Sequence, residues 1–311
     1  MADHASEVDP NLVLEAAGLP EAVLQPGPES VASPTCRAVD SLTYHLEHPT
    51  THQPLFLKIM HAEMRRFYDL DAAIAGARLA SELGIGPRVV WADVALGAVL
   101  FERLEAGWHT ATLDRLQTPE ILNQTLAGLA CLHAAQPMAA RFDPFARIDE
   151  LSERASALNL PMPDDFWWIL RMVEAIEQAT SASPLAPCRN EGNASNLMIS
   201  DGGDVMLLDF DRAGMNDPLY DVGVVLNEAH YFESEMRMAF GIYLGREDPK
   251  AFNRARLYAI VDDVMCALWG LVAARTTARE QIEFMKYGEW RLMRARLALN
   301  HPQFEEKLRG L

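Results

Sequence analysis

The chain has 311 residues and a formal net charge of −17, and half of its residues are hydrophobic. This length suits a two-lobed enzyme or two ordinary domains, and the composition is typical of a globular protein. The charge argues against nucleic acid and against an anionic membrane surface as partners, because both favour basic proteins. It is compatible with a cationic small substrate and equally with ordinary solubility.

The N-terminal sequence MADHASEVDP is acidic and polar, and no uninterrupted run of about 18 apolar residues occurs in the chain. We therefore expect neither a signal peptide nor a membrane span. The four cysteines are widely spaced and form no CxxC pair. This pattern favours reduced thiols and a cytoplasmic protein.

The first third of the chain predicts a small antiparallel sheet. After a short helix over residues 11–17, the segments CRAVDS, SLTYHLEH and PLFLKIM have the composition of strands, with a turn at HPTTHQP. A helix is then predicted within residues 69–87, with stop signals at Gly84, Gly86 and Pro87. Two further strands, RVVWADV and GAVLFERLE, complete the predicted sheet.

Helices dominate from about residue 106. One is predicted over residues 118–135, with Thr118 as its N-terminal cap and Pro119 as its first residue. A second is predicted over residues 164–180. The segment NLMISDGGDVMLLDFD reads as a β-hairpin, because two apolar runs flank the turn residues DGGD. Helices are predicted again after residue 216.

The polar segment CRNEGNASN precedes this hairpin, and Asp209 and Asp211 follow its second apolar run. Carboxylate and amide oxygens are the hard ligands that Mg²⁺ prefers, together with water and phosphate oxygens. Asn196 and Asp209 stand at opposite arms of the hairpin, so both oxygens can serve one metal ion. The pattern predicts a magnesium and phosphate site.

These motifs resemble the aminoglycoside phosphotransferase and choline kinase superfamily, and most closely its bacterial choline/ethanolamine kinase branch. The family's loop H-x-D-x-x-x-x-N corresponds to RNEGNASN at residues 189–196, and its D-x-D/E corresponds to DFD at residues 209–211. RAGMNDPLYDVG then matches A/S-G-x-x-D-P-x-x-D-L, and LWG near residue 269 also fits the branch.

The resemblance implies an α+β, protein-kinase-like fold with two lobes. Residues 1–104 would form a nucleotide-binding N-lobe with an antiparallel sheet and one helix. Residues 105–311 would form a helical C-lobe with the catalytic loop, the metal-binding hairpin and the acceptor-binding helices. The implied cofactors are ATP and Mg²⁺, and the implied acceptor is a small alcohol, with amino alcohols such as choline or ethanolamine as candidates. A homodimer is one candidate assembly.

The resemblance also implies roles for individual residues. Lys58 would hold phosphates, with Asp69 or Asp71 as its acidic partner from the following helix. Glu102 and Leu104 would lie in the hinge that contacts adenine through backbone groups, and Ser33 in the loop over the phosphates. Metal binding would fall to Asn196, Asp209 and Asp211, and catalysis to Glu191 with Arg189. The candidates for a partial aromatic cage around an ammonium group are Trp269, Tyr287 and Trp290. His133, Asp217 and Asp221 are expected to be structural.

Three departures from the family pattern keep a second function open. Glu191 replaces Asp, which moves the carboxylate outward by about one ångström. Arg189 replaces His, and an ion pair between Arg189 and Glu191 would neutralise the base. No glycine occurs between Pro28 and Ala75, where the phosphate-covering loop is expected. An active phosphotransferase is therefore weighed against a pseudokinase that binds nucleotide or ligand with little turnover.

Overall fold

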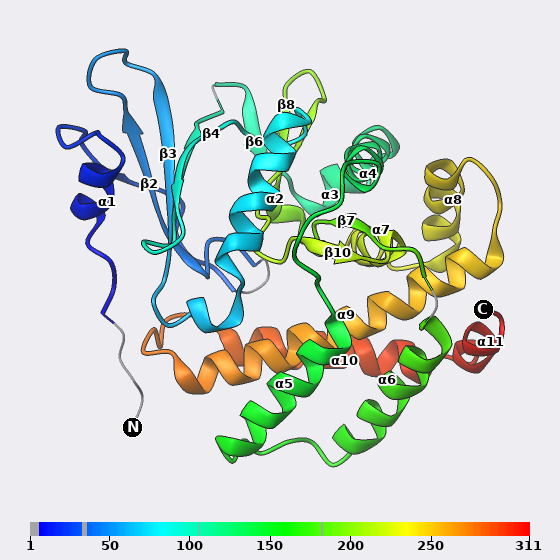
Figure 1. Cartoon of the computed structure of the whole chain (residues 1–311). Coiled ribbons are helices and arrows are strands. Elements are labelled where there is room, and N and C mark those ends of the chain that lie inside the picture. The colour runs from blue at the N-terminus through cyan, green and yellow to red at the C-terminus, as the bar shows by residue number, and fades with distance from the viewer. Residues whose placement is uncertain (1–5, 33–35, 105, 182) are drawn as a thin grey trace.

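The computed structural model describes residues 6–32, 36–104, 106–181 and 183–311. A five-stranded antiparallel sheet with one long helix beside it forms the first part, and a larger helical part follows (Figure 1). The elements of the first part are α1 (Pro10–Ala16), β1 (Gln25–Pro26), β2 (Ser41–Glu47), β3 (Pro54–Met60), η1 (Arg65–Phe67), α2 (Leu70–Glu82), β4 (Val89–Asp93) and β5 (Ala98–Glu102). Ser33 lies outside the described residues.

The remaining elements are mostly helical. They are β6 (Trp108–Thr110), α3 (Leu113–Leu116), α4 (Pro119–His133), α5 (Pro144–Ala157), α6 (Phe166–Thr180), β7 (Ala186–Cys188), η2 (Ala194–Asn196), β8 (Leu197–Ser200), β9 (Val205–Leu207), β10 (Gly214–Asn216), α7 (Pro218–Ala229), α8 (Glu233–Leu244), α9 (Pro249–Thr276), α10 (Phe284–Leu299) and α11 (Phe304–Arg309). The predicted hairpin is β8–β9, which β6 extends to three strands.

Strand β3 shows why the sheet positions a lysine. Leu55, Leu57 and Ile59 are fully buried and pack against Val13 of α1, so one face of the sheet forms a small apolar core. Because side chains alternate along a strand, Lys58 projects from the opposite face. The order of the strands is β1-β2-β3-β5-β4, which places β3 in the centre of the sheet.

One local prediction needs correction. CRAVDS is not a strand before its last residue: β1 forms the edge of the sheet, and the chain turns at Ala38, whose φ of 50° is left-handed. The predicted start of α4 is confirmed, with Thr118 at the N-cap and Pro119 as the first residue. The Thr118 side chain caps no amide there and donates instead to the carbonyl of Arg115 at 2.8 Å.

Helix α2 packs closely on the segment that follows β9. A Cβ at Gly76 would overlap the Cβ of Ala213, so only glycine permits this approach. The helix starts at the Asp69 cap, whose side chain accepts from the amide of Ala72 at 3.0 Å, and it ends before Gly84 with φ of 70°. The first part is thereby fixed against the hairpin that carries Asp209.

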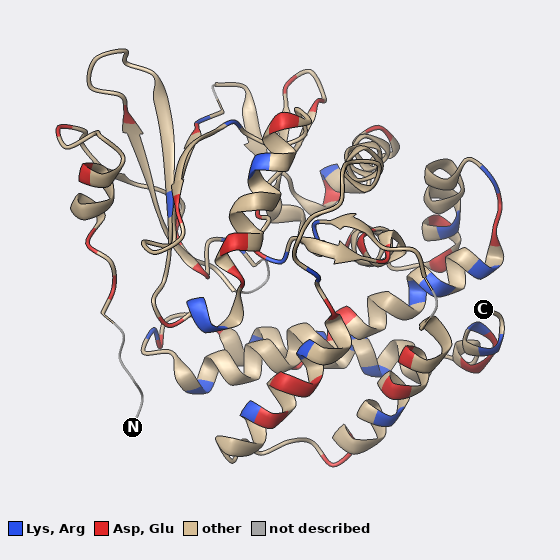
Figure 2. Ribbon diagram, in the orientation of Figure 1, with Lys and Arg blue, Asp and Glu red and all other residues tan. Residues whose placement is uncertain are grey.

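Helix α9 forms the centre of the larger core and packs against α10, α7 and α5. Its length and an 18-residue window of mean hydropathy 1.7 would suffice to cross a membrane, but 94% of that window is buried inside the protein. From Leu257 to Ala273 its charged residues are two buried aspartates, Asp262 and Asp263, whereas α5 and α6 carry many acidic and basic residues (Figure 2). This is the pattern of a core helix.

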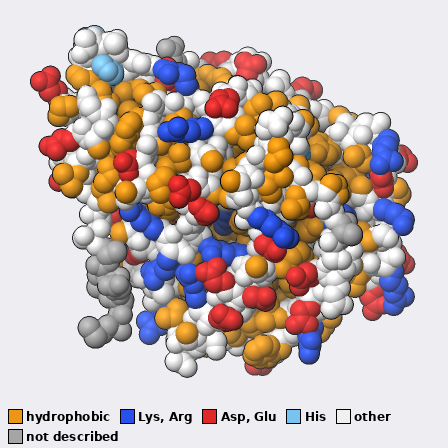
Figure 3. All heavy atoms as spheres, in the orientation of Figure 1, with side chains coloured by type: hydrophobic (Ala, Val, Ile, Leu, Met, Phe, Trp, Pro, Cys, Tyr) orange, Lys and Arg blue, Asp and Glu red, His pale blue; other side chains and the backbone are white. Residues whose placement is uncertain are grey.

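Acidic and basic side chains are interspersed over the lower half of the face in Figure 3, with apolar areas above them. The excess of acidic residues is thus spread over many elements, and no broad basic surface appears on this face.

Candidate active site

A cavity of about 380 Å³ separates the sheet from the helical part. Its walls come from β3, the segment after β5, the loop before β8 and the end of the β8–β9 hairpin. Predicted site residues among its lining are Lys58, Glu102, Leu104, Glu191, Asn196, Asp209, Asp211 and Trp269. Segments far apart in the chain therefore meet at one cleft.

The lysine and the predicted metal ligands are in direct contact. The Lys58 Nζ lies 2.7 Å from an oxygen of Asp209 and 2.7 Å from an oxygen of Asp211. The amide nitrogen of Asn196 donates to the other oxygen of Asp209 at 3.0 Å. Asp209 has a φ of 60°, an unusual conformation that turns its carboxylate out of the strand direction. These groups are close enough to share one bound nucleotide.

Negative charge exceeds positive charge at this end of the cavity. Burial and the nearby Asp209 raise the pKa of Asp211 to about 8, and the same two causes raise the pKa of Asp40 to about 6. Burial alone would lower the pKa of Lys58, but Asp209 and Asp211 hold it above its ordinary value. One oxygen of Asp40 is buried without a hydrogen-bond partner among the described residues. Three carboxylates around one lysine, with the amide oxygen of Asn196, are a donor set that fits a divalent cation.

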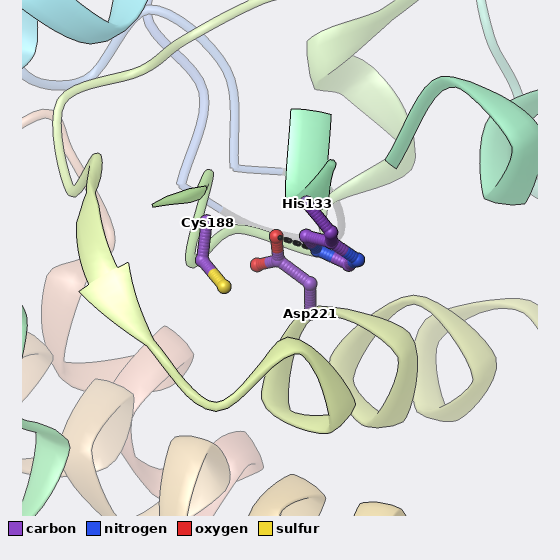
Figure 4. Close-up of side chains that lie close together, drawn as sticks. All are labelled: His133, Cys188 and Asp221. Carbon is purple, nitrogen blue, oxygen red and sulfur yellow. Dashed lines mark hydrogen bonds and ion pairs between the residues drawn. The ribbon is translucent and has the colours of Figure 1, made fainter. Parts of the chain in front are cut away.

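Asp221 on α7 anchors the loop that begins at Arg189. Its carboxylate accepts from the backbone amides of Arg189 at 2.9 Å and Asn190 at 2.6 Å, and from His133 Nε2 at 3.0 Å. Asn190 adopts a left-handed φ of 60°. Figure 4 shows His133, Asp221 and Cys188 converging on this point. The predicted structural roles of His133 and Asp221 are confirmed.

The same three side chains have a spacing that metal sites also show, with their ligand atoms within 4.8 Å of one another. Their chemistry is that of a structural anchor. Both oxygens of Asp221 already accept hydrogen bonds, and His133 Nδ1 is bonded to the Tyr243 hydroxyl at 3.0 Å. Burial, followed by Asp221, raises the pKa of Cys188 well above its ordinary value, so the thiol keeps its proton.

Arg189 does not enter the cavity, and its predicted catalytic role needs correction. The side chain is completely buried, and it donates to the carbonyls of Leu208 at 2.8 Å and Asn196 at 3.0 Å. Among the described residues it forms no ion pair with Glu191. Arg189 therefore links the loop that contains it to the β8–β9 hairpin. The expected ion pair that would neutralise Glu191 is not formed by this arginine.

Glu191 does line the cavity. One carboxylate oxygen accepts from the amide of Asn193 at 2.7 Å, and the other lies 3.8 Å from Nη1 of Arg212. Burial raises the pKa of Glu191 above its ordinary value, although Arg212 and then Arg189 oppose this shift. A buried carboxylate with a raised pKa and one constrained oxygen is suited to accept a proton from a substrate hydroxyl.

The remaining nucleotide residues have mixed outcomes. Glu102 and Leu104 both line the cavity, and Glu102 also forms an ion pair with Arg88. The structure does not bring Asp71 to Lys58: Asp71 is exposed on α2, and Asp69 caps that helix. Lys58 pairs with hairpin carboxylates instead.

The aromatic cage is not assembled. Trp269 lines the first cavity and a second one of about 420 Å³. Tyr287 is buried behind it, with ring centroids 5.8 Å apart and edge to face, and Trp290 packs on Tyr287 and under Arg294. Neither Tyr287 nor Trp290 lines either cavity. Both predictions are corrected: these rings are packing residues.

Sequence reasoning missed Asp40 and Arg212, which both line the cleft. Arg212 directly follows the DFD motif, so its position in the sequence could have identified it. Asp40 was missed because its segment was predicted to be a strand. In the structure the chain turns there and brings Asp40 to the cleft.

The sequence profile of the phosphotransferase enzyme family matches residues 37–260. The chain belongs to this family. This phosphotransferase is 22% identical over 231 residues to Protein LicA of Haemophilus influenzae, covering 68% of this chain and 80% of LicA. It shares the fold of a choline/ethanolamine kinase family protein from Mesorhizobium loti, with a TM-score of 0.76, 22% identity and coverage of 93% and 92% of the two chains.

A structure of LicA in complex with AMP is also similar to this phosphotransferase, with a TM-score of 0.73, 18% identity and coverage of 95% and 99% of the two chains. These likenesses confirm the predicted α+β, protein-kinase-like fold. The sheet with α2 is the smaller lobe, and the helical part is the larger lobe.

Proposed function

We propose that this phosphotransferase moves the γ-phosphoryl group of ATP, with Mg²⁺, to the hydroxyl of a small alcohol. The observation that carries the proposal is the contact of Lys58, Asn196 and Asp209 in one cleft, with carboxylates in excess over the lysine. The AMP complex of a relative with the same fold supports a nucleotide in this cleft. The names of the relatives make choline and ethanolamine the first acceptors to test.

The residues divide the work of phosphoryl transfer. Lys58 would bind phosphate oxygens, and Asn196, Asp209 and Asp211 would hold the metal ion, whose positive charge would stabilise the phosphates. Glu191 orients the alcohol and accepts its proton. A bond forms between the alcohol oxygen and the γ-phosphorus while the bond from that phosphorus to the bridging oxygen breaks, and ADP leaves.

The alternative, nucleotide binding with little turnover, is supported by the two replaced loop residues and by the lack of glycine between Pro28 and Ala75. The structure weakens the support from the loop, because Glu191 keeps its place at the cleft and Arg189 is engaged with two carbonyls. What remains against turnover is the lack of glycine, together with the acidic Asp40 in the segment that leads into β2.

Two measurements test the proposal. Thermal unfolding with and without ATP and Mg²⁺ measures nucleotide binding, and ADP release against a panel of amino alcohols, polyols, hydroxy acids and aminoglycosides measures turnover. We expect stabilisation that Lys58→Met removes, and ADP release that depends on the acceptor. Arg171→Gln, an exposed pair residue on α6, is the matched control. Stabilisation without acceptor-dependent release would favour the pseudokinase, and no stabilisation would refute both.

A further inference from the structure

The two cavities share a neck. Four residues line both of them: Tyr68, Asp211, Arg212 and Trp269. Asp211 belongs to the metal-binding set, so the neck begins where the phosphoryl group would be transferred. Glu191 lines only the first of these two cavities, so an acceptor held in the second cavity would extend past these four residues to reach it.

Arg212 brings a guanidinium to the neck. Its Nη1 lies 3.8 Å from Glu191, 3.8 Å from Asp262 and 3.3 Å from the sulfur of Cys266. Its Nε and Nη2 donors have no hydrogen-bond partner among the described residues. Asp262 is itself paired with Arg291, so it only partly balances the charge of Arg212. Three N–H bonds, on two nitrogens of a fixed planar group, are thus uncommitted.

Trp269 lines the neck without offering it a polar group. The residue is only 4% exposed, and its indole nitrogen is buried with no hydrogen-bond partner among the described residues. Because that nitrogen is out of reach of solvent, Trp269 presents apolar ring atoms to the two cavities. The cationic group at the neck is Arg212.

The carboxylates of the second cavity are already engaged. Asp69 and Asp143 accept backbone amides as helix caps, and Glu150 pairs with Arg147 and Arg154. Asp211, which lines both cavities, pairs with Lys58. Arg66, by contrast, donates its Nε to a backbone carbonyl and has no carboxylate partner among the described residues. The uncommitted groups of the second cavity and its neck are therefore cationic donors.

We propose that the acceptor is an alcohol that carries a carboxylate or another anionic oxygen group, which Arg212 binds at the neck while the hydroxyl reaches Glu191. A quaternary ammonium has no hydrogen-bond acceptor and would lie beside the charge of Arg212, so choline fits this neck poorly. A primary ammonium only donates. This inference deepens the proposed phosphotransferase function and rests on it.

The test compares acceptors that differ in charge but share a hydroxylated three-carbon frame: glycerate, glycerol and 3-amino-1,2-propanediol, with choline and ethanolamine alongside. ADP release gives kcat/KM for each, and calorimetry with ATP analogue and Mg²⁺ gives binding. We expect glycerate to exceed glycerol by about tenfold or more, which corresponds to one charge-assisted hydrogen bond. Equal or better use of choline, ethanolamine, 3-amino-1,2-propanediol or glycerol overturns the proposal, as does glycerate that neither binds nor reacts.

Variants separate the neck from the rest of the site. Arg212→Gln should lower the ratio of kcat/KM for glycerate over glycerol by about tenfold. The ratio cancels any effect of Arg212 on Glu191 that is common to both acceptors. Arg212→Lys should restore part of the ratio, and Arg171→Gln should leave it unchanged. Thermal unfolding of each variant confirms folding, and an unchanged ratio in Arg212→Gln overturns the assignment.

Failure of this inference is distinguishable from failure of the proposed function. A cationic or neutral alcohol that is phosphorylated best leaves the phosphotransferase function intact and refutes only the anionic acceptor. Absence of nucleotide binding refutes the function itself, whichever alcohol is used.

Discussion

The two ends of the cleft differ in how their charges are balanced. At the nucleotide end, Asp40, Asp209 and Asp211 surround Lys58, and the pKa values of Asp40 and Asp211 are raised to about 6 and about 8. At the acceptor end, Glu191 lies near Arg212 and leaves guanidinium donors uncommitted. The first end lacks positive charge, and the second end lacks hydrogen-bond acceptors.

This difference indicates what each end is built to receive. An excess of carboxylates is costly until a cation joins them, so the nucleotide end suits Mg²⁺ with its phosphates. A guanidinium with free donors in a fixed plane matches a carboxylate, so the acceptor end suits an anionic alcohol. The residues that match the family pattern cluster at the nucleotide end, whereas Arg212 is the group that characterises the acceptor end. Substitutions at each end test whether this division of labour is real.

The largest effect is expected from Asp209→Asn at the nucleotide end. The change removes a charged metal ligand and one partner of Lys58, so preorganised charge is lost where the transition state needs it. We expect kcat to fall by about a thousandfold, measured as ADP release at saturating Mg²⁺. Asp204→Asn, on the exposed turn of the same hairpin, is the control and should keep full activity. Activity within tenfold of the wild type would refute the metal assignment.

The next effect is expected at Glu191. Glu191→Gln keeps the size and the acceptor for the Asn193 amide but cannot take a proton, so kcat should fall by about a hundredfold or more. Glu191→Asp tests the loop itself, because it restores the family's residue and should retain or raise activity. If Glu191→Gln is as active as the wild type, the carboxylate is not the base.

The same carboxylate sets the expected pH dependence. Burial raises the pKa of Glu191, and the base works only when it is deprotonated. The value of kcat/KM should therefore fall as the pH falls through this raised pKa. Arg212→Gln removes the cation that lowers the pKa of Glu191, so the acid limb should move to higher pH. A limb that moves to lower pH would contradict the contact between the two side chains.

Local patterns predicted most of the nucleotide end. The alternation in PLFLKIM placed Lys58 on the face opposite Leu57, and the turn DGGD joined the arms that carry Asn196 and Asp209. These features depend on residues that are close together in the sequence, so the sequence alone predicts them. The anchoring role of Asp221 came from resemblance, and its hydrogen bonds confirm it.

The acceptor end depends on contacts between distant segments, and there prediction was less successful. Tyr287 has the residue type and spacing of a cage member, but Phe284 and Trp269 enclose it in the core. Arg189 was expected to pair with Glu191, two residues away, and instead reaches two carbonyls across the loop. Helical spacing and adjacency do not reveal which face of a helix becomes core.

A smaller effect, on stability rather than on chemistry, is expected from Asp221→Ala beneath the catalytic loop. The change leaves two backbone amides and His133 without their buried acceptor. We expect the free energy of unfolding to fall by about 3 kcal/mol, measured by urea denaturation. Asp201→Ala removes an exposed carboxylate that contacts exposed His109 and should cost less than about 0.5 kcal/mol. Equal losses in the two variants would show that the anchor contributes no more than a surface pair.

The smallest effect on the free energy of unfolding is expected from Asp40→Asn, and this change should stabilise the protein. Burial, followed by Asp209, raises the pKa of Asp40 to about 6 in the folded protein, above its ordinary value in the unfolded chain. The folded state therefore binds more protons between about pH 4 and pH 6, and the wild type loses stability as the pH rises through that window. Asparagine does not titrate, so without nucleotide and Mg²⁺ the variant should be more stable than the wild type by about 2 kcal/mol at pH 8 and by less at pH 5.

Urea denaturation at the two pH values measures this difference, with exposed Asp71→Asn as the control that should change stability by less than about 0.5 kcal/mol at both. A variant that is less stable than the wild type at pH 8 would mean that Asp40 has a cationic partner in the free protein. The nucleotide end would then be balanced before any ligand arrives, and the contrast between the two ends of the cleft would disappear. Stabilisation at pH 8 would instead indicate that Asp40 persists at a cost to the fold, as expected of a carboxylate retained for ligand binding.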